Sequence, residues 1–189
     1  MGGNLGKLEE AFKSLSDEMQ AHSLMLIEIS EEIAKMSGKK LDKNKLIACC
    51  VLHDILNHEN NHASVGAEYA KKYLQKKKFS KKFIDSVYEG IFYHSDKPKV
   101  DDFTIACFYD SDILCRFYAL GVLRAWNNIK FDKNRDWKNF FKEVSKEENL
   151  RNYVMAMKNK LQVNSSKKIL ETKVEEYISA HKFIAGLIN

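Results

Sequence analysis

The chain has 189 residues, 44% of them hydrophobic and 30% charged, with one proline and a formal net charge of +5. This length suffices for one domain with a buried core, and the apolar content excludes an intrinsically disordered chain. No apolar run approaches the roughly 20 residues that a membrane-spanning helix requires, and the first residues lack the basic start and apolar stretch of a secretory signal. The four cysteines lie in apolar segments without a C-x-x-C pair, which is typical of reduced core thiols. We therefore expect a cytoplasmic protein that does not associate with membranes.

Apolar residues recur at helical spacing along almost the whole chain, and alternating β patterns are nearly absent. The spacing predicts helices over 5–15, 17–36, 43–56, 62–75, 80–94, 101–126, 134–144, 147–160 and 165–188. Ser14 and Asp17 have the spacing of a capping box before the second helix, and Gly38 is a stop signal after it. Since no Ser/Gly-rich linker or internal repeat is present, we expect a single all-α domain over 1–189. Its core would lie at about 15–130, with the C-terminal helices packed on that core.

The positive charge is concentrated in a lysine-rich stretch between positions 71 and 82. Lysines dispersed in this way are typical of a solvated helix surface, and the alternative is an electropositive rim that attracts a phosphorylated ligand. No nucleic-acid-binding motif accompanies them, so no nucleic-acid partner is expected.

Polar residues that can bind a metal interrupt segments that are otherwise apolar. His53 and Asp54 follow the apolar run Leu46–Leu52, and a helix of that composition is buried. A buried imidazole and carboxylate must be paired or coordinated to offset the cost of desolvation. Asp112 lies in a second apolar helix, and His22 lies on the apolar stripe of a third. Two imidazoles and two carboxylates from three helices suit a divalent ion that keeps open positions for water.

Each of these residues also has a simpler interpretation. A lone buried histidine is more often a hydrogen-bonded core residue than a ligand. Asp54 could cap the helix that follows it, and Asp112 could form an ion pair with Arg116 at i, i+4. The four residues together favour the metal site.

The order of four residues in this chain resembles the H…HD…D signature of the HD superfamily of metal-dependent phosphohydrolases: His22, His53, Asp54 and Asp112. Flanking elements are similar to those of one small bacterial and archaeal subgroup of single-domain proteins. They are the H-x-x-x-G-A element at 62–67, the I…I…H helix ending at His94, the D-A-D-x-L element at 110–114, and then Ala119, Gly121 and Arg124. The resemblance covers roughly positions 15–185 and implies an all-α HD-domain bundle.

The resemblance also implies which residues form the site. One divalent ion, of Mn, Mg, Fe, Co, Ni or Zn, would be bound by His22, His53, Asp54 and Asp112. For His62 and His94 two interpretations stay open, a second metal bridged by Asp54 or direct contact with the substrate phosphate.

The implied reaction is hydrolysis of a phosphate ester or anhydride by a metal-bound water. Its substrate would be a small phosphorylated molecule, with a nucleotide favoured. Arg116 and Arg124 would bind the phosphoryl group. The catalytic residues would be Asp54 together with Glu59 or Asp110 for proton transfer, and Asp110 could instead orient a ligand histidine.

Two other functions fit the same residues. The six candidate ligands would suit a His-rich diiron oxygenase of the HD fold. Ile113, Cys115 and Tyr118 depart from the subgroup pattern, which motivates a catalytically weak nucleotide-binding module instead. The oligomeric state is left open by the sequence, a homodimer included.

Overall fold

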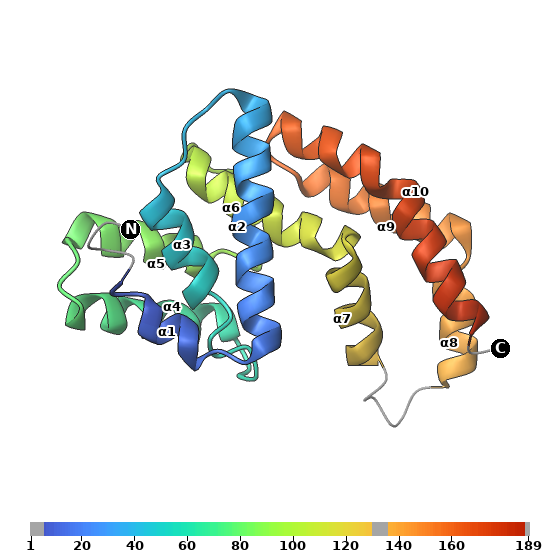
Figure 1. Cartoon of the computed structure of the whole chain (residues 1–189), viewed down its shortest axis with the longest axis horizontal. Helices are drawn as coiled ribbons and strands as arrows, with labels where there is room; N and C mark the ends of the chain where they lie inside the picture. Colours follow the sequence, from blue (N-terminus) through green and yellow to red (C-terminus); the bar gives the residue numbers. More distant parts are fainter. Residues whose placement is uncertain (1–5, 130–135, 188–189) are drawn as a thin grey trace.

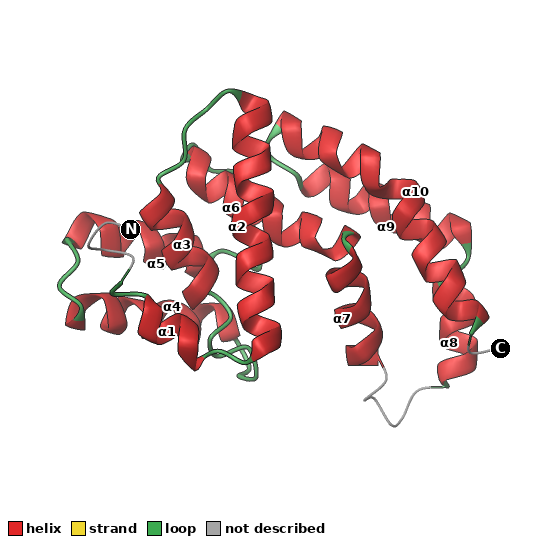
Figure 2. Cartoon of the chain, viewed as in Figure 1, coloured by secondary structure: helices red, strands yellow, loops and turns green. Residues whose placement is uncertain are grey.

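The computed structural model describes residues 6–129 and 136–187. Within these ranges the chain forms ten α-helices, one short 3-10 helix and no strand, which confirms the all-α prediction (Figure 2). The helices are α1 (Glu9–Ser14), α2 (Asp17–Ser37), α3 (Lys43–Leu52), α4 (His62–Lys76), α5 (Lys81–Phe92), α6 (Phe103–Leu114), η1 (Cys115–Phe117), α7 (Ala119–Ile129), α8 (Trp137–Val144), α9 (Glu147–Lys160) and α10 (Asn164–Gly186). Positions 5, 134, 135 and 188 of the predicted helices lie outside the described residues.

The helices form two groups on either side of a central pair, α2 and α6 (Figure 1). At one end α1, α3, α4 and α5 pack together, with α4 and α5 as an antiparallel hairpin. At the other end α9 and α10 lie side by side, and α10 contacts α2, α6 and α7. No helix among the described residues is long and apolar enough to cross a membrane. The division into a core and C-terminal helices stays a prediction.

The ends of α2 are set by local hydrogen bonds. The hydroxyl of Ser16 accepts the N–H of Met19 at 3.3 Å, so Ser16 is the N-cap. The predicted capping box of Ser14 and Asp17 is wrong, because the Ser14 hydroxyl instead donates to the carbonyl of Ala11 at 2.7 Å. The predicted stop at Gly38 is confirmed, since this residue adopts the left-handed conformation with φ +64°.

Two predicted helices end earlier in the structure than their apolar patterns suggested. The helix expected over 43–56 ends at Leu52, and turns replace it up to position 61, where the polar residues favour turns. The helix expected over 101–126 is interrupted by η1 and by Tyr118, whose backbone is extended. Gly121 explains the second break. A Cβ there would lie only 2.0 Å from the Cys115 carbonyl oxygen, so α7 folds back closely against η1.

The core is continuous between α2, α3 and α6. Leu26, Leu52 and Phe108, one from each helix, are completely buried. Because these three helices pack closely, the polar side chains at their contact are largely shielded from solvent.

A buried carboxylate attaches α10 to the central helices. Asp110 on α6 is fully buried, and its oxygens accept the N–H of Gln162 at 2.9 and 3.2 Å and that of Val163 at 2.8 Å. These two N–H groups directly precede α10, so Asp110 fixes where that helix begins relative to α6.

Candidate metal centre

Three side chains from α2 and the end of α3 meet in the interior. His22, His53 and Asp54 each offer one ligand atom, and these atoms all lie within 4.8 Å of one another. His22 and His53 are almost completely buried, at 3% and 1% exposure. Two imidazoles and one carboxylate at this spacing form a donor set for a divalent ion.

A second group of donors lies on the other side of Asp54. His62, the first residue of α4, and His94, just after α5, point their Nε2 atoms at Asp54 Oδ1 from 3.9 and 3.5 Å. The other oxygen, Oδ2, lies 3.4 Å from Nε2 of His53. Asp54 therefore presents one oxygen to each group of histidines.

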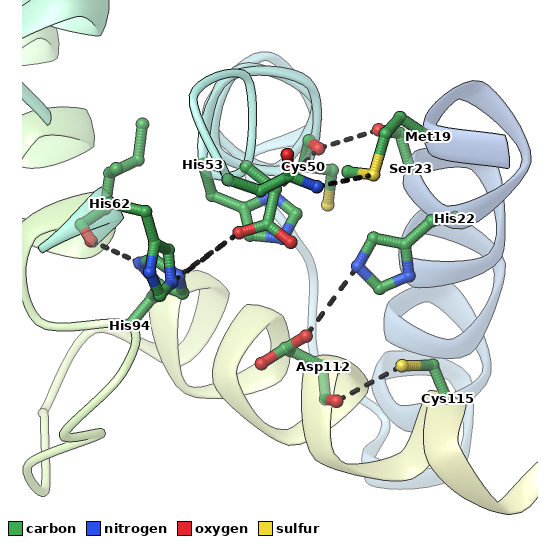
Figure 3. Close-up of polar contacts among 12 residues, drawn as sticks. Met19, His22, Ser23, Cys50, His53, His62, His94, Asp112 and Cys115 are labelled. Atoms are coloured by element: carbon green, nitrogen blue, oxygen red, sulfur yellow. Dashed lines mark hydrogen bonds and ion pairs between the residues drawn. The ribbon is translucent and has the colours of Figure 1, made fainter. Parts of the chain in front are cut away.

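Asp112 joins the first group from α6. Its Oδ1 lies 3.8 Å from Nε2 of His22, and Figure 3 shows the two side chains pointing toward one another. Its Oδ2 is bound to the ammonium of Lys97 at 2.8 Å, rather than to Arg116 as the i, i+4 alternative proposed. His22 therefore links the four residues expected to bind one ion, since it lies near Asp112 on one side and near His53 and Asp54 on the other.

Cys115 also lies beside Asp112, but as a hydrogen-bond donor. Its thiol donates to the Asp112 carbonyl at 3.2 Å (Figure 3). Burial raises the pKa of the Cys115 thiol far above its usual range, which disfavours the thiolate that a metal ligand would need.

The histidine rings are oriented by backbone carbonyls. Nδ1 of His53 lies 3.1 Å from the Cys50 carbonyl oxygen, and Nδ1 of His94 lies 2.6 Å from that of Ile91. A carbonyl only accepts, so each Nδ1 carries a proton and each Nε2 faces Asp54. Nε2 of His53 is buried and makes no hydrogen bond of good geometry with any described residue, although Asp54 Oδ2 lies 3.4 Å away. A buried nitrogen without a good hydrogen bond is typical of a metal ligand. His22, His53 and Asp54 therefore suit a divalent ion.

The pKa shifts of Asp54 and His22 favour metal binding, whereas that of His53 opposes it. Burial tends to raise the pKa of Asp54, but the charges of His53 and His94 outweigh it and hold this pKa well below its usual range. Burial lowers the pKa of His22 to about 4, so its imidazole is neutral. Burial also opposes a charge on His53, yet the Asp54 carboxylate raises the pKa of this imidazole. A metal ion must displace that proton, so its affinity should fall as the pH falls.

Two cavities open on the centre from different sides. The first, of about 350 Å³, is lined by His22, Asp54 and Asp112, by Arg116 and Arg124, and by three side chains from α9 and α10: Tyr153, Tyr177 and His181. The second, of about 230 Å³, is lined by Asp54, His62, His94, Ser95, Lys97, Asp112 and Arg116. Both carboxylates and Arg116 thus border both cavities.

A family model for the HD domain matches residues 19–120 of this chain. The chain belongs to the HD-domain family. Its fold is similar to the crystal structure of a predicted HD superfamily hydrolase from an uncultured Thermotogales bacterium, with a TM-score of 0.59 and 22% sequence identity. That similarity covers 97% of this chain and 91% of the other. Among curated proteins no match was found.

The predicted phosphoryl-binding arginines of this HD-domain protein both line the larger cavity. The Arg116 guanidinium donates to the Tyr153 hydroxyl at 3.4 Å, and Arg124 donates to the Glu18 carboxylate at 2.9 Å. Arg124 is thus paired with a carboxylate, whereas the Arg116 guanidinium hydrogen-bonds a neutral hydroxyl and interacts electrostatically with Asp112.

The two predicted proton-transfer residues lie elsewhere. Glu59 is exposed, with its carboxylate 3.4 Å from Nε2 of His58, and Asp110 is bound to the start of α10. Neither is among the described residues that line the two cavities. Their catalytic roles stay predictions, and the contacts of Asp110 give it a structural role.

Several residues border the centre of this HD-domain protein without having been predicted to do so, among them Lys97, Tyr153, Tyr177 and His181. His181 is buried and packs on Tyr177 with ring centroids 4.4 Å apart. The tyrosines lie more than 40 positions after Asp112, and no local pattern connects them to it.

Proposed function

We propose that this HD-domain protein is a divalent-metal-dependent phosphohydrolase that acts on a small phosphate ester or anhydride, with a nucleotide as the favoured substrate. The observation that carries the proposal is the His22–His53–Asp54 group, together with a cavity that His22, Asp54, Asp112 and Arg116 line. The hydrolase named in the structural comparison supports the same reaction class.

The chemistry can be assigned to residues of the two cavities. A divalent ion bound there would supply a Lewis acid and a water of lowered pKa. Arg116 reaches both cavities and would neutralise charge that develops on the phosphoryl group. His62 and His94 would either bind phosphoryl oxygens or complete a second metal site with Asp54.

The larger cavity supports a substrate with an aromatic ring. The rings of Tyr153 and Tyr177 lie nearly parallel, with an interplanar angle of 21° and centroids 6.3 Å apart. Together with His181 they form an aromatic wall of the cavity that Asp54 and Asp112 also line. A nucleobase could pack on this wall while its phosphate lies at the metal centre.

We also propose the conditions in which the protein works. The protein would bind its small substrate and neither nucleic acid nor a membrane. Whether it forms a homodimer is to be measured. All four cysteines are buried and free, which supports a reducing compartment such as the cytoplasm.

The test measures phosphate or pyrophosphate released from a panel of nucleotides with Mn²⁺, Mg²⁺, Co²⁺ or Ni²⁺ added. Asp54→Asn should abolish release, while Asp85→Asn, a change at an exposed carboxylate on α5, should leave it unchanged. Release that persists in Asp54→Asn would mean that the activity comes from another site. Binding of a nucleotide without any release would identify the non-catalytic module instead.

A diiron oxygenase is the second candidate, favoured by the Asp54–His62–His94 group beside the first. Elemental analysis of the protein, with Asp112→Asn and His62→Ala as comparators, separates the possibilities. A dinuclear centre should lose half its metal in His62→Ala. A coloured iron protein with redox-sensitive spectra would favour the oxygenase over the hydrolase.

A further inference from the structure

Lys97 is a buried cation in contact with two candidate ligands. It lies in the loop between α5 and α6, and its side chain is only 7% exposed. The ammonium lies 2.8 Å from Asp112 Oδ2 and also donates to the carbonyl of His94. Burying a lysine is costly unless its charge is paired, and here the partner is a residue expected to hold the metal.

The backbone at Lys97 is unfavourable for a lysine as well. Its φ is +51°, in the left-handed region that glycine and asparagine adopt most readily. A residue with a long side chain is strained in this conformation. The exposed Lys78 has a similar φ of +58°, so the backbone alone indicates no function. The burial of the charge beside Asp112 is what points to a function for Lys97.

The pairing leaves Asp112 with one oxygen for a metal. Oδ2 is held by Lys97, whereas Oδ1 faces His22. Lys97 also places a positive charge close to any divalent ion on Oδ1, and this repulsion must weaken metal binding.

The smaller cavity has the charge and size for a single phosphoryl group. Its 230 Å³ are bordered by the cations Lys97 and Arg116 and by the carboxylates Asp54 and Asp112. These charges cancel, so one divalent ion would leave a surplus of two positive charges. That surplus matches the dianion of a phosphate monoester, and it exceeds the single negative charge of a diester.

We propose that Lys97 is a specificity-determining residue, which keeps one oxygen of Asp112 from the metal and binds the phosphoryl oxygens of a dianionic phosphate monoester in the smaller cavity. The claim that Lys97 weakens metal binding stands on the contacts alone. The claim that it binds a phosphate monoester rests on the proposed function.

The test compares Lys97→Met, Lys97→Arg and the control Lys99→Met by calorimetric titration, first with Mn²⁺ and then with inorganic phosphate added to the Mn²⁺-loaded protein. Lys99 is exposed and two positions away. Removing the Lys97 charge should tighten Mn²⁺ binding by about tenfold, since a unit charge and a divalent ion repel across a few ångströms of protein. Phosphate binding should weaken by about tenfold in Lys97→Met. Both constants should return toward wild type in Lys97→Arg and stay unchanged in Lys99→Met.

Lys97→Asn controls for the possibility that Lys97→Met disturbs the fold, because asparagine tolerates the left-handed backbone. It should retain the helical circular dichroism of the wild type and bind Mn²⁺ as tightly as Lys97→Met does. Unchanged or weaker Mn²⁺ binding in both variants would overturn the proposal, as would unchanged phosphate binding. These are binding measurements and do not require turnover. If the protein shows the expected shifts but hydrolyses none of the nucleotides, the proposed phosphohydrolase function is wrong and the role of Lys97 still holds.

Discussion

The contact between η1 and α7 yields a sharp prediction for Gly121→Ala. An added Cβ would lie 2.0 Å from the Cys115 carbonyl oxygen, 2.6 Å from the Arg116 Cα and 2.7 Å from the Cys115 carbonyl carbon. All three are backbone atoms, so no side chain can rotate to make room. Reaching an ordinary contact of 3.4 Å requires the two segments to separate by about 1.4 Å.

The expected cost of this separation is about 3 kcal/mol, at the upper end of the range for overpacking. For a chain of this size that corresponds to a fall in Tm of about 6–12 °C, measured by circular dichroism at 222 nm. The matched control is Gly186→Ala, where an added Cβ meets no atom within 4 Å. It should be neutral or stabilise by up to about 1 kcal/mol. A Tm for Gly121→Ala within about 2 °C of wild type would refute the close contact and the explanation of the helix break.

Three further predictions concern α9 and α10. Asp110→Asn removes a charged acceptor from the N–H groups of Gln162 and Val163, so the free energy of unfolding in urea should fall by about 1–3 kcal/mol; a change below about 0.5 kcal/mol would contradict the anchoring role. Burial lowers the pKa of His181 to about 4, below the 6.5 of an exposed imidazole. Its neutral form therefore stabilises the fold above pH 6.5, and this contribution, at most about 3 kcal/mol, is lost as the pH falls from 6.5 toward 4. His181→Gln should show a shallower loss of stability over that interval, and parallel pH curves for the two proteins would rule this out. Tyr153→Leu should raise the KM for a nucleotide about tenfold through lost stacking and leave that for a small aliphatic phosphate monoester unchanged; equal effects on both substrates would argue against base recognition.

The fold class and the helices could be predicted because helical periodicity is a local property of the sequence. Gly38 ends α2 as its conformational freedom suggests. The break after Leu114 could not be predicted, because the helical spacing of apolar residues continues across it and the break depends on how closely Gly121 approaches η1.

The candidate site shows the same division. His22, His53 and Asp54 could be identified as candidates because buried polar residues in apolar helices need partners, and the structure brings them together. The ion pair between Lys97 and Asp112 joins a loop to a helix, and only the packed fold reveals it. The i, i+4 spacing instead suggested Arg116 as the partner of Asp112. That spacing is too common in helices to identify a partner.

The Asp-Ser-Asp segment of α6 has a consequence for how large a ligand the protein can accept. Asp110 holds the origin of α10 while Asp112, two residues later on the same rigid helix, faces the opposite direction into the centre. The side chains of α10 in the aromatic wall are therefore held at a constant distance from the Asp112 carboxylate. A hinge motion of α10 would have to break the hydrogen bonds of Asp110. Adaptation to bulkier molecules should then proceed by exchanging the side chains on the inner face of α9 and α10, with the helix axes left where they are.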